Sequence, residues 1–384
     1  MELHPGGNLD LRGTTVDAAT WDAVRAAATG PDGVVRLGRC RLDDARLDCA
    51  DFHGVVFEGD VSFDRAEFRR GTAFRDAVFT GNAGFHEAVF HRGVSFDHAV
   101  FLRHAGFTGT RFNGDALFTC VRWHTDVAFT GAWFVGAADL DRASCARDVQ
   151  AQETRFSSPI SWRHGSVERH LLLDRAAFRD CAWLGPLTVG GRISLNSARA
   201  SRTLRLTATA PQVSIRNAML HATTLRTPAD LSHTTATELH LQGDGPLTLT
   251  GTVADAARLT GVDLGACLFE SAELAELALR DCRFPGRLAE EPAAWTADLY
   301  RRLAEATDDP EQAREFRYRA VEIYRKSHPS PWWRFLLAVC RVTSGYGHDP
   351  VRMHVTLAVL LVACLLMAGL GIEEGTGLVH LAHP

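Results

Sequence analysis

The sequence predicts an all-β solenoid, and three observations support this prediction. Between residues 52 and 134, a large aromatic side chain recurs in steps of five and six that settle into regular alternation. Ala, Val or Thr stands two residues before every one of these rings. The same stretch holds ten Gly, each of which costs about 1 kcal/mol in a helix interior. The stretch is therefore a tandem array with an 11-residue unit.

The aromatic positions are the predicted structural core ladder. Fifteen of the sixteen are Phe and the other is Trp. They are Phe52, Phe57, Phe63, Phe68, Phe74, Phe79, Phe85, Phe90, Phe96, Phe101, Phe107, Phe112, Phe118, Trp123, Phe129 and Phe134.

A helix is the alternative interpretation, because an 11-residue repeat can also produce a right-handed coiled coil. In a helix, residues five apart lie roughly 130 to 140° apart around the axis, so the rings would not form one stripe. The spacing instead fits a chain that makes a short straight segment, turns a corner and repeats. Each side then points one large and one small side chain into a common interior.

Units such as Ala99-Val100-Phe101-Leu102-Arg103 resemble the pentapeptide-repeat family. The resemblance implies a right-handed quadrilateral β-helix, in which four sides of five or six residues make a coil of about 22. Phe63, Phe85, Phe107 and Phe129 would then form one stack, with successive coils about 4.8 Å apart.

The array extends beyond its Phe-rich part. It continues backward to Leu37 and forward, with weaker residues, to Leu206. Around Pro211 the register is lost, and a strict five-residue form returns from Leu259 to Phe284. We therefore expect a β-helix over 37–284, with roughly eleven coils at one strand spacing per coil.

The segments at both ends of the array are expected to be helical. Residues 1–36 form an N-terminal cap whose short helix begins near Asp17 and ends at Gly30-Pro31, and it would cover the open end of the first coil. Residues 285–328 read as a helical hairpin. This hairpin would either cover the last coil or join subunits.

The C-terminal region predicts membrane attachment. Residues 331–350 form an expected interfacial amphipathic segment and junction, and 351–372 an expected transmembrane helix, because residues 355 to 372 carry no charge. The predicted anchor residues are Trp332, Trp333, Arg334, Arg341 and Arg352. The positive residues before this run, with Glu373 and Glu374 after it, place 373–384 outside the cytoplasm.

The junction supplies a second resemblance. The run from Ser344 to Arg352 is similar to an S-G-Y-G-x-x-P-x-R sequence in bacterial membrane-anchored pentapeptide-repeat proteins. It implies a single-pass protein of the bacterial inner membrane with most of its chain in the cytoplasm. Some relatives carry further spans or a channel-like segment, whereas this chain shows one hydrophobic run, so the resemblance does not extend to a pore in a single subunit.

The residues give little indication of catalytic chemistry. Five histidines (His86, His91, His98, His104 and His124) sit at outward positions beside the Phe columns, where a surface ladder with Asp64 and Asp126 is favoured over a metal site. No phosphate-binding loop, dinucleotide fingerprint or nucleophile elbow is present. We therefore expect no enzyme, no catalytic residue, no metal and no cofactor.

Composition sets the expected compartment and thiol chemistry. The formal charge is −5, and there is no CxxC pair among nine Cys. Cys40, Cys267 and Cys282 take the small interior position, which favours buried thiols in a reducing cytoplasm. Met1 to Thr20 lacks the apolar core of a secretory signal.

Three functional hypotheses remain open. The first is a membrane-tethered scaffold that binds a protein partner, with homo-oligomer formation left open. The second is a membrane effector, for example in bacterial defence, whose oligomerised spans perturb the bilayer. The third is a DNA mimic that protects gyrase, which the resemblance to soluble relatives brings in; it needs a continuous acidic face. Residues 37–284 hold 29 acidic residues against 27 Arg, so nucleic-acid mimicry or binding is not expected.

Overall fold

The structure is a computed structural model. It describes residues 4–48, 51–226, 228–243, 245–284, 294–344, 346, 351, 354–359 and 361–362. The chain divides into two compact units, Met1–Glu290 and Glu291–Pro384, and each is described by itself.

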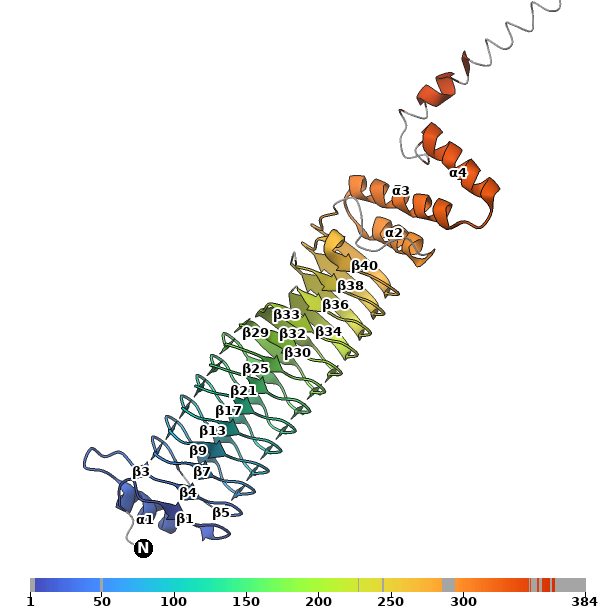
Figure 1. The fold of residues 1–384 in the computed structure, drawn as a ribbon. Coiled ribbons are helices and arrows are strands. Elements are labelled where there is room, and N and C mark those ends of the chain that lie inside the picture. Colours follow the sequence, from blue (N-terminus) through green and yellow to red (C-terminus); the bar gives the residue numbers. More distant parts are fainter. Residues whose placement is uncertain are drawn as a thin grey trace, which may run out of the picture. The chain divides into compact units, whose positions relative to one another are not determined.

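The first unit is a parallel β-solenoid of about 11 turns (Figure 1). Its coils are built from two-residue strands. One coil holds β6 (Val56–Phe57), β7 (Val61–Ser62), β8 (Glu67–Phe68) and β9 (Thr72–Ala73), and the next coil starts with β10 (Val78–Phe79). Val78 pairs with Val56, 22 residues earlier. The predicted solenoid and its 22-residue coil are confirmed for this part of the chain.

The strands form two parallel sheets. One side of the coil belongs to a 13-stranded sheet, and the other sides are joined in a 27-stranded sheet. Every backbone bond of the ladder runs between neighbouring coils, as in Phe63 N to Gly84 O at 2.7 Å. Because the strands of one coil bond only to the coils before and after it, the stack is held together along its whole length.

The aromatic rings fill the interior. All sixteen rings are at most 3% exposed. Rings one coil apart stack: Phe63 and Phe85 have centroids 5.0 Å apart, and Phe85 and Phe107 are 4.8 Å apart. Rings on opposite sides meet edge to face, as Phe74 and Phe85 do at 5.6 Å. Both arrangements are the ones that aromatic quadrupoles favour, each worth about 0.5–1.5 kcal/mol beyond the area buried.

The coils change near the middle of the unit. Strands of eight residues replace pairs of short strands and the corner between them, first in β29 (Ala182–Val189) and later in β34 (Met219–Arg226). Three further long strands follow: β36 (Thr235–Gln242), β38 (Val253–Thr260) and β40 (Glu273–Arg280). The repeat shortens accordingly, since Ser214 pairs with Asp230 and Ala229 with Leu247.

The solenoid begins earlier than residue 37. β1 (Leu9–Asp10) pairs with β4 (Cys40–Arg41), and β2 (Thr15–Val16) pairs with β5 (Arg46–Leu47). Helix α1 (Ala18–Ala28) interrupts the first coil, and the Asp17 side chain accepts a hydrogen bond from Thr20 N at 2.8 Å at its start. Trp21 of α1 is buried against Phe52, with ring centroids 4.4 Å apart.

The second unit is helical. It contains α2 (Ala294–Ala306), α3 (Pro310–Ser327) and α4 (Pro331–Ser344). Asp309 caps α3, accepting hydrogen bonds from Glu311 N and Gln312 N, and Pro310 occupies the first turn. Tyr300 of α2 and Phe316 of α3 pack together, with ring centroids 6.2 Å apart.

The predicted transmembrane helix is corrected by the structure. Within the described residues, no helix is both long and apolar enough to cross a membrane. The reason is physical: α4 has 14 residues, short of the roughly 17 needed, and the 18-residue α3 is rich in Arg and Glu. Residues 352, 353, 360 and 363–384, which include most of the expected span and the whole expected tail, lie outside the described residues.

Candidate functional surfaces

The core ladder is a structural feature of the interior. The aromatic columns fill the interior of the coils that contain them. The exposed fraction of each of the sixteen rings is at most 3%. Binding by the solenoid must therefore use the residues that point outward from its sides and corners.

Outward carboxylates bind the backbone of the next coil. Asp64 accepts a hydrogen bond from His86 N at 3.0 Å, and Asp148 accepts one from His170 N at 3.0 Å. His104 Nδ1 lies 3.1 Å from the carbonyl oxygen of Asp126. These contacts form surface ladders along the solenoid. Among the described residues, no group of three or more His, Cys, Asp or Glu side chains is arranged to hold a metal ion.

Ion pairs also link the coils. Arg65 pairs with Asp44 at 2.8 Å, Arg163 with Asp141 at 2.7 Å, and Arg175 with Glu153 at 2.9 Å. These side chains are largely exposed, apart from the half-buried Asp141, so solvent screens each pair and its contribution to stability is small. They occupy part of the charged groups on these surfaces.

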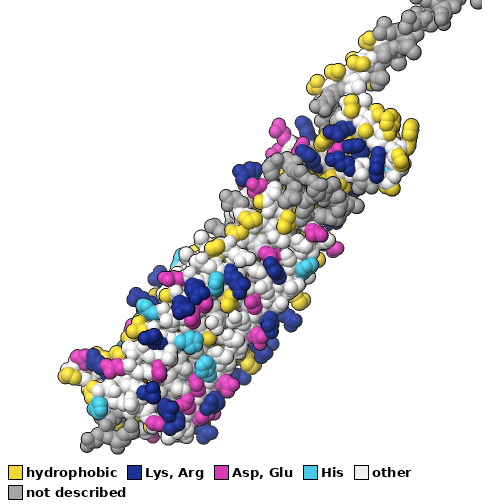
Figure 2. All heavy atoms as spheres, viewed as in Figure 1, with side chains coloured by type: hydrophobic (Ala, Val, Ile, Leu, Met, Phe, Trp, Pro, Cys, Tyr) yellow, Lys and Arg dark blue, Asp and Glu magenta, His cyan; other side chains and the backbone are white. Residues whose placement is uncertain are grey.

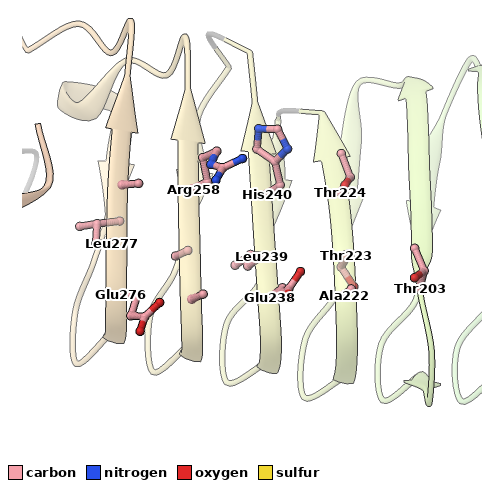
Figure 3. A pocket seen from close by; sticks show the side chains of 13 residues that line it. Thr203, Ala222, Thr223, Thr224, Glu238, Leu239, His240, Arg258, Glu276 and Leu277 are labelled. Carbon is pink, nitrogen blue, oxygen red and sulfur yellow. The ribbon is translucent and has the colours of Figure 1, made fainter. Parts of the chain in front are cut away.

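A groove lies on the long strands near the end of the solenoid. It has a volume of about 560 Å³ and crosses β32 (Leu204–Thr209), β34, β36, β38 and β40. Figure 3 shows that Glu238, His240, Arg258 and Glu276 come from neighbouring strands along it. The register places His240 beside Arg258, and it places Glu238 and Glu276 on either side of Ala256.

The charges of the groove differ from those of the ion-pair ladders. In the described part of the chain, Arg258 has no acidic side chain within ion-pairing distance, and Glu238 and Glu276 have no basic one. His240 Nε2 lies 3.2 Å from Thr260 Oγ1. Burial lowers the pKa of His240, and the positive charge of Arg258 lowers it further. The groove therefore offers a neutral imidazole, a free guanidinium and two free carboxylates near neutral pH.

Helix α4 presents an apolar face. Trp332 is 67% exposed and Trp333 50% exposed. Phe335, Leu336, Val339 and Val342 are also exposed, and with Trp332 they follow the spacing of one helix face. Among the described residues of α1, α2, α3 and α4, nearly all exposed large apolar side chains belong to α4.

The predicted anchor arginines are engaged within the helical unit. Arg341 lies 3.2 Å from Glu322 and donates a hydrogen bond to Tyr318 Oη. Arg334 Nε donates to the carbonyl oxygen of His328 at 2.5 Å. Arg352 lies outside the described residues. Helix α4 thus offers apolar side chains, whereas its two described arginines are bonded to neighbouring groups.

Glu322 of α3 organises the junction. Arg325 lies 2.7 Å from it, and Tyr346 Oη donates a hydrogen bond to it at 2.6 Å. Burial alone would raise the pKa of Glu322, but the hydrogen bonds from Arg325 and Tyr346 and the nearby positive charges lower it overall. Burial and the same carboxylate raise the pKa of Tyr346 to about 12. The junction tyrosine therefore has a structural role, as it fixes this segment to α3.

The interior thiols are unreactive by environment. Burial raises the pKa of Cys40 and of Cys267 to about 12, and that of Cys145 to about 11. A thiol that stays protonated near neutral pH is a poor nucleophile and metal ligand. These positions act as small apolar fillers of the core.

The geometry defines the class of protein: a parallel β-solenoid with four sides and a filled aromatic core. A model of the family described as pentapeptide repeats (9 copies) matches residues 42–89 and 74–122, which supports placing the chain in the pentapeptide-repeat family. Comparisons with curated proteins and with solved structures gave no match. The match covers the Phe-rich coils and does not extend to α4 or the groove.

Sequence reasoning did not find the groove. Most of its residues lie between Pro211 and Arg258, where the register could not be followed, and Glu276 lies in the five-residue part that comes after this stretch. A signal was present in the pairs Leu239-x-Leu241 and Leu247-x-Leu249, because both give inward-facing residues on short strands. The sequence did not show the coil length, because the coil length varies between neighbouring coils in this region.

Proposed function

We propose that this protein is a non-enzymatic scaffold that binds a protein partner close to a membrane surface. The observation that carries the proposal is the distribution of chemistry over the molecule. The solenoid interior is filled by apolar side chains, while the groove carries unpaired charges and α4 carries exposed apolar side chains. A stiff body with binding groups on its outside suits recognition better than catalysis.

The groove is the proposed partner-binding surface. Glu238 and Glu276 would accept basic side chains of the partner, and Arg258, two residues along β38 from the Ala256 that separates them, would bind an acidic one. Such complementary charges mainly determine specificity and the rate of association. The fit requires a protein surface with alternating charges along about 10 Å, because Glu238 and Glu276 lie two strand spacings apart.

Helix α4 is the proposed membrane-contact element, lying on the surface of the bilayer. Trp residues favour the interface between lipid and water, and a helix with one apolar face binds there without crossing. This form of attachment needs no helix long enough to span the membrane. In this proposal Trp332 and Trp333 keep their predicted role as membrane anchors. Arg341 does not contact the membrane, because it pairs with Glu322.

Membrane binding is tested with lipid vesicles and the full chain. Replacing Trp332 and Trp333 by Ala should weaken binding roughly 10- to 100-fold per side chain, since burying a large apolar side chain contributes about 1.5–3 kcal/mol. Trp183→Ala is the matched control, because Trp183 is 40% exposed on the solenoid. Equal vesicle binding by the double variant and the wild type would remove α4 from the proposal.

Partner binding is tested by affinity capture with variants of the groove. Arg258→Glu should lose a partner that the wild type retains, because it replaces the guanidinium of the groove by a third acidic group near Glu238 and Glu276. Arg280→Glu is the control, since Arg280 is exposed at the end of β40 outside the groove. A protein captured equally by both variants would not be a groove ligand.

The charge pattern does not favour DNA mimicry. Figure 2 shows basic and acidic side chains interspersed along the visible face of the solenoid. Along the side that contains β4, β7 (Val61–Ser62) and β11 (Ala83–Gly84), basic side chains such as Arg41 and Arg65 interrupt the acidic ones, and Arg65 directly follows Asp64. A continuous acidic face would be needed to imitate the phosphate backbone.

A further inference from the structure

One side of the solenoid differs from the others in its outward residues. It is built by β5, β8, β12 (Val89–Phe90), β16 (Arg111–Phe112), β20 (Trp133–Phe134), β24 (Arg155–Phe156), β28 (Ala177–Phe178) and β31 (Arg199–Ala200). We call the outward residue of each strand and the two residues that follow each strand the basic face.

The basic face has a strong excess of positive charge. Its nine arginines are Arg46, Arg69, Arg70, Arg92, Arg111, Arg155, Arg179, Arg199 and Arg202. Its three acidic residues are Asp48, Glu67 and Asp180. This excess stands out because the whole chain has a formal charge of −5.

Almost none of this positive charge is neutralised within the molecule. Arg69 pairs with Asp48 and with Glu67, both at 3.6 Å. Arg202 pairs with Asp180 at 3.7 Å. The three acidic residues are thereby occupied, and the other seven arginines have no ion-pair partner in the part of the chain that the structure describes.

Basic and apolar side chains alternate along one column of this face. Register places Arg111, Trp133, Arg155, Ala177, Arg199 and Met219 on successive coils. Arg155 and Arg199 are exposed, and Met219 is 58% exposed. The arginines of the column therefore lie two strand spacings, about 10 Å, apart with an uncharged side chain between them.

We propose that the basic face is a second membrane-contact surface, specific for anionic lipid. Its guanidinium groups would bind lipid phosphates and carboxylates, while the exposed Met219 would reach the boundary of the acyl chains. The proposal rests on the proposed function, since it adds to α4 the positive charge that α4 lacks. A weak apolar anchor commonly needs a basic patch as its second signal for stable membrane binding.

The same column argues against a nucleic acid as the ligand. Binding to single strands commonly uses aromatic faces on which bases stack. Trp133 is not available for this, because the Arg111 guanidinium lies 4.2 Å from the centroid of its ring and its Nε1 donates to Ser157 Oγ at 2.9 Å. Exposed Met219 likewise suits a lipid boundary better than a phosphate backbone.

The test compares two triple variants of the full chain in vesicle co-sedimentation. The first is Arg155→Glu/Arg179→Glu/Arg199→Glu. The control is Arg39→Glu/Arg103→Glu/Arg122→Glu, which makes the same charge change on the opposite side of the coil, where these exposed arginines also have no ion-pair partner among the described residues. Vesicles of phosphatidylcholine mixed with phosphatidylserine are compared with vesicles of phosphatidylcholine alone.

The basic-face variant should bind the phosphatidylserine vesicles at least about 100-fold more weakly than the control variant, from about a fivefold effect for each of the three basic residues near the surface. Added salt should abolish the difference. Equal binding by the two variants would overturn the proposal, as would a wild type that binds a short DNA or RNA duplex through these arginines and shows no preference for phosphatidylserine.

The outcomes separate this inference from the proposed function. If the wild type binds vesicles through Trp332 and Trp333 but the two triple variants behave alike, only the basic face is removed. If the wild type binds neither type of vesicle, the membrane role of α4 fails together with it.

Discussion

At the residue scale, the corner two positions after every second interior ring has a left-handed backbone. Arg65, Glu87 and His98 have φ of 57°, 56° and 60°, and Gly109 and Gly131 occupy the same place in later coils with φ of 69° and 68°. The corner is a turn in which Ala132 N, for example, donates to Phe129 O at 2.9 Å. Residues other than Gly cost roughly 1–2 kcal/mol in this conformation, so each corner without Gly destabilises the fold by about this amount.

This conformation predicts opposite outcomes for two Gly-to-Ala substitutions. Gly131→Ala should lower the free energy of unfolding by about 1 kcal/mol, since its φ is +68° and nothing else lies within 4 Å of a new Cβ. Gly71→Ala is the matched control: its φ lies outside the left-handed region and its Cβ would meet Gly93 O at 3.7 Å, so stability should stay equal or rise by about 0.4–1 kcal/mol. Urea unfolding midpoints decide, and equal losses would contradict the backbone argument.

His240 gives the molecule a pH dependence of known sign. Burial and Arg258 lower its pKa in the folded protein below the ordinary value of 6.5. The unfolded state therefore binds the proton more readily, and stability should be complete above pH 6.5 and fall as the pH drops below it. His240→Gln should reduce this part of the pH dependence of urea unfolding. A loss of the same size in wild type and variant would assign the effect to other groups.

At the element scale, the Phe-rich coils could be predicted because each side carries one large marker residue at a fixed step. Phe63, Phe85 and Phe107 therefore give the coil length directly from the sequence. After β29 the long strands absorb corners, and partners lie 16 residues apart at Ser214 and Asp230 but 20 apart at Leu247 and Cys267. Because the spacing between paired residues is not constant after β29, the sequence does not give the register of these strands. The groove that they form could not be predicted for this reason.

The α4 region shows a different limit of sequence reasoning. Its apolar face follows from the spacing of Trp332, Phe335 and Val339, and the structure places these side chains in the open. The roles of its arginines did not follow from spacing, because Glu322 lies 19 residues before Arg341 and only the packing of α3 and α4 brings them together. The basic face likewise depends on the register between coils, which places arginines from distant parts of the sequence on one side. A charge count along the sequence does not show this clustering.

The interior column that contains Phe107 and Phe129 continues with the small side chain of Ala151. The packing of the column has a defect at this position. Leu173 follows one coil later, and a cavity of about 20 Å³ lies among Phe129, Ala151 and Leu173. Ala151→Leu should fill it and raise the free energy of unfolding by about 1 kcal/mol. Ala132→Leu, at a fully buried small position, should instead lower it by about 1–3 kcal/mol through overpacking. Thermal or urea unfolding checks both, and destabilisation by both would show that the cavity cannot accept a side chain.

At the scale of the whole solenoid, stability and solubility depend on its first end. A parallel stack leaves the apolar interior and the backbone groups of its terminal coil exposed unless something covers them. Here α1 covers that end: Trp21 is 2% exposed, its ring packs on Phe52, and its Nε1 donates to the carbonyl oxygen of Asp51 at 2.8 Å. The cap is a single helix of 11 residues, so one side chain supplies much of its contact.

Trp21→Ala should therefore have two effects. The free energy of unfolding should fall by about 3–5 kcal/mol, as expected when a buried Trp is truncated. The uncovered end should also associate with other copies, so light scattering should show a concentration-dependent rise in mass before any unfolding is seen by circular dichroism. Asp22→Ala, on the exposed face of α1, should change neither quantity. A Trp21→Ala protein that is destabilised but stays monomeric would mean that α1 stabilises the first coil without protecting it from association.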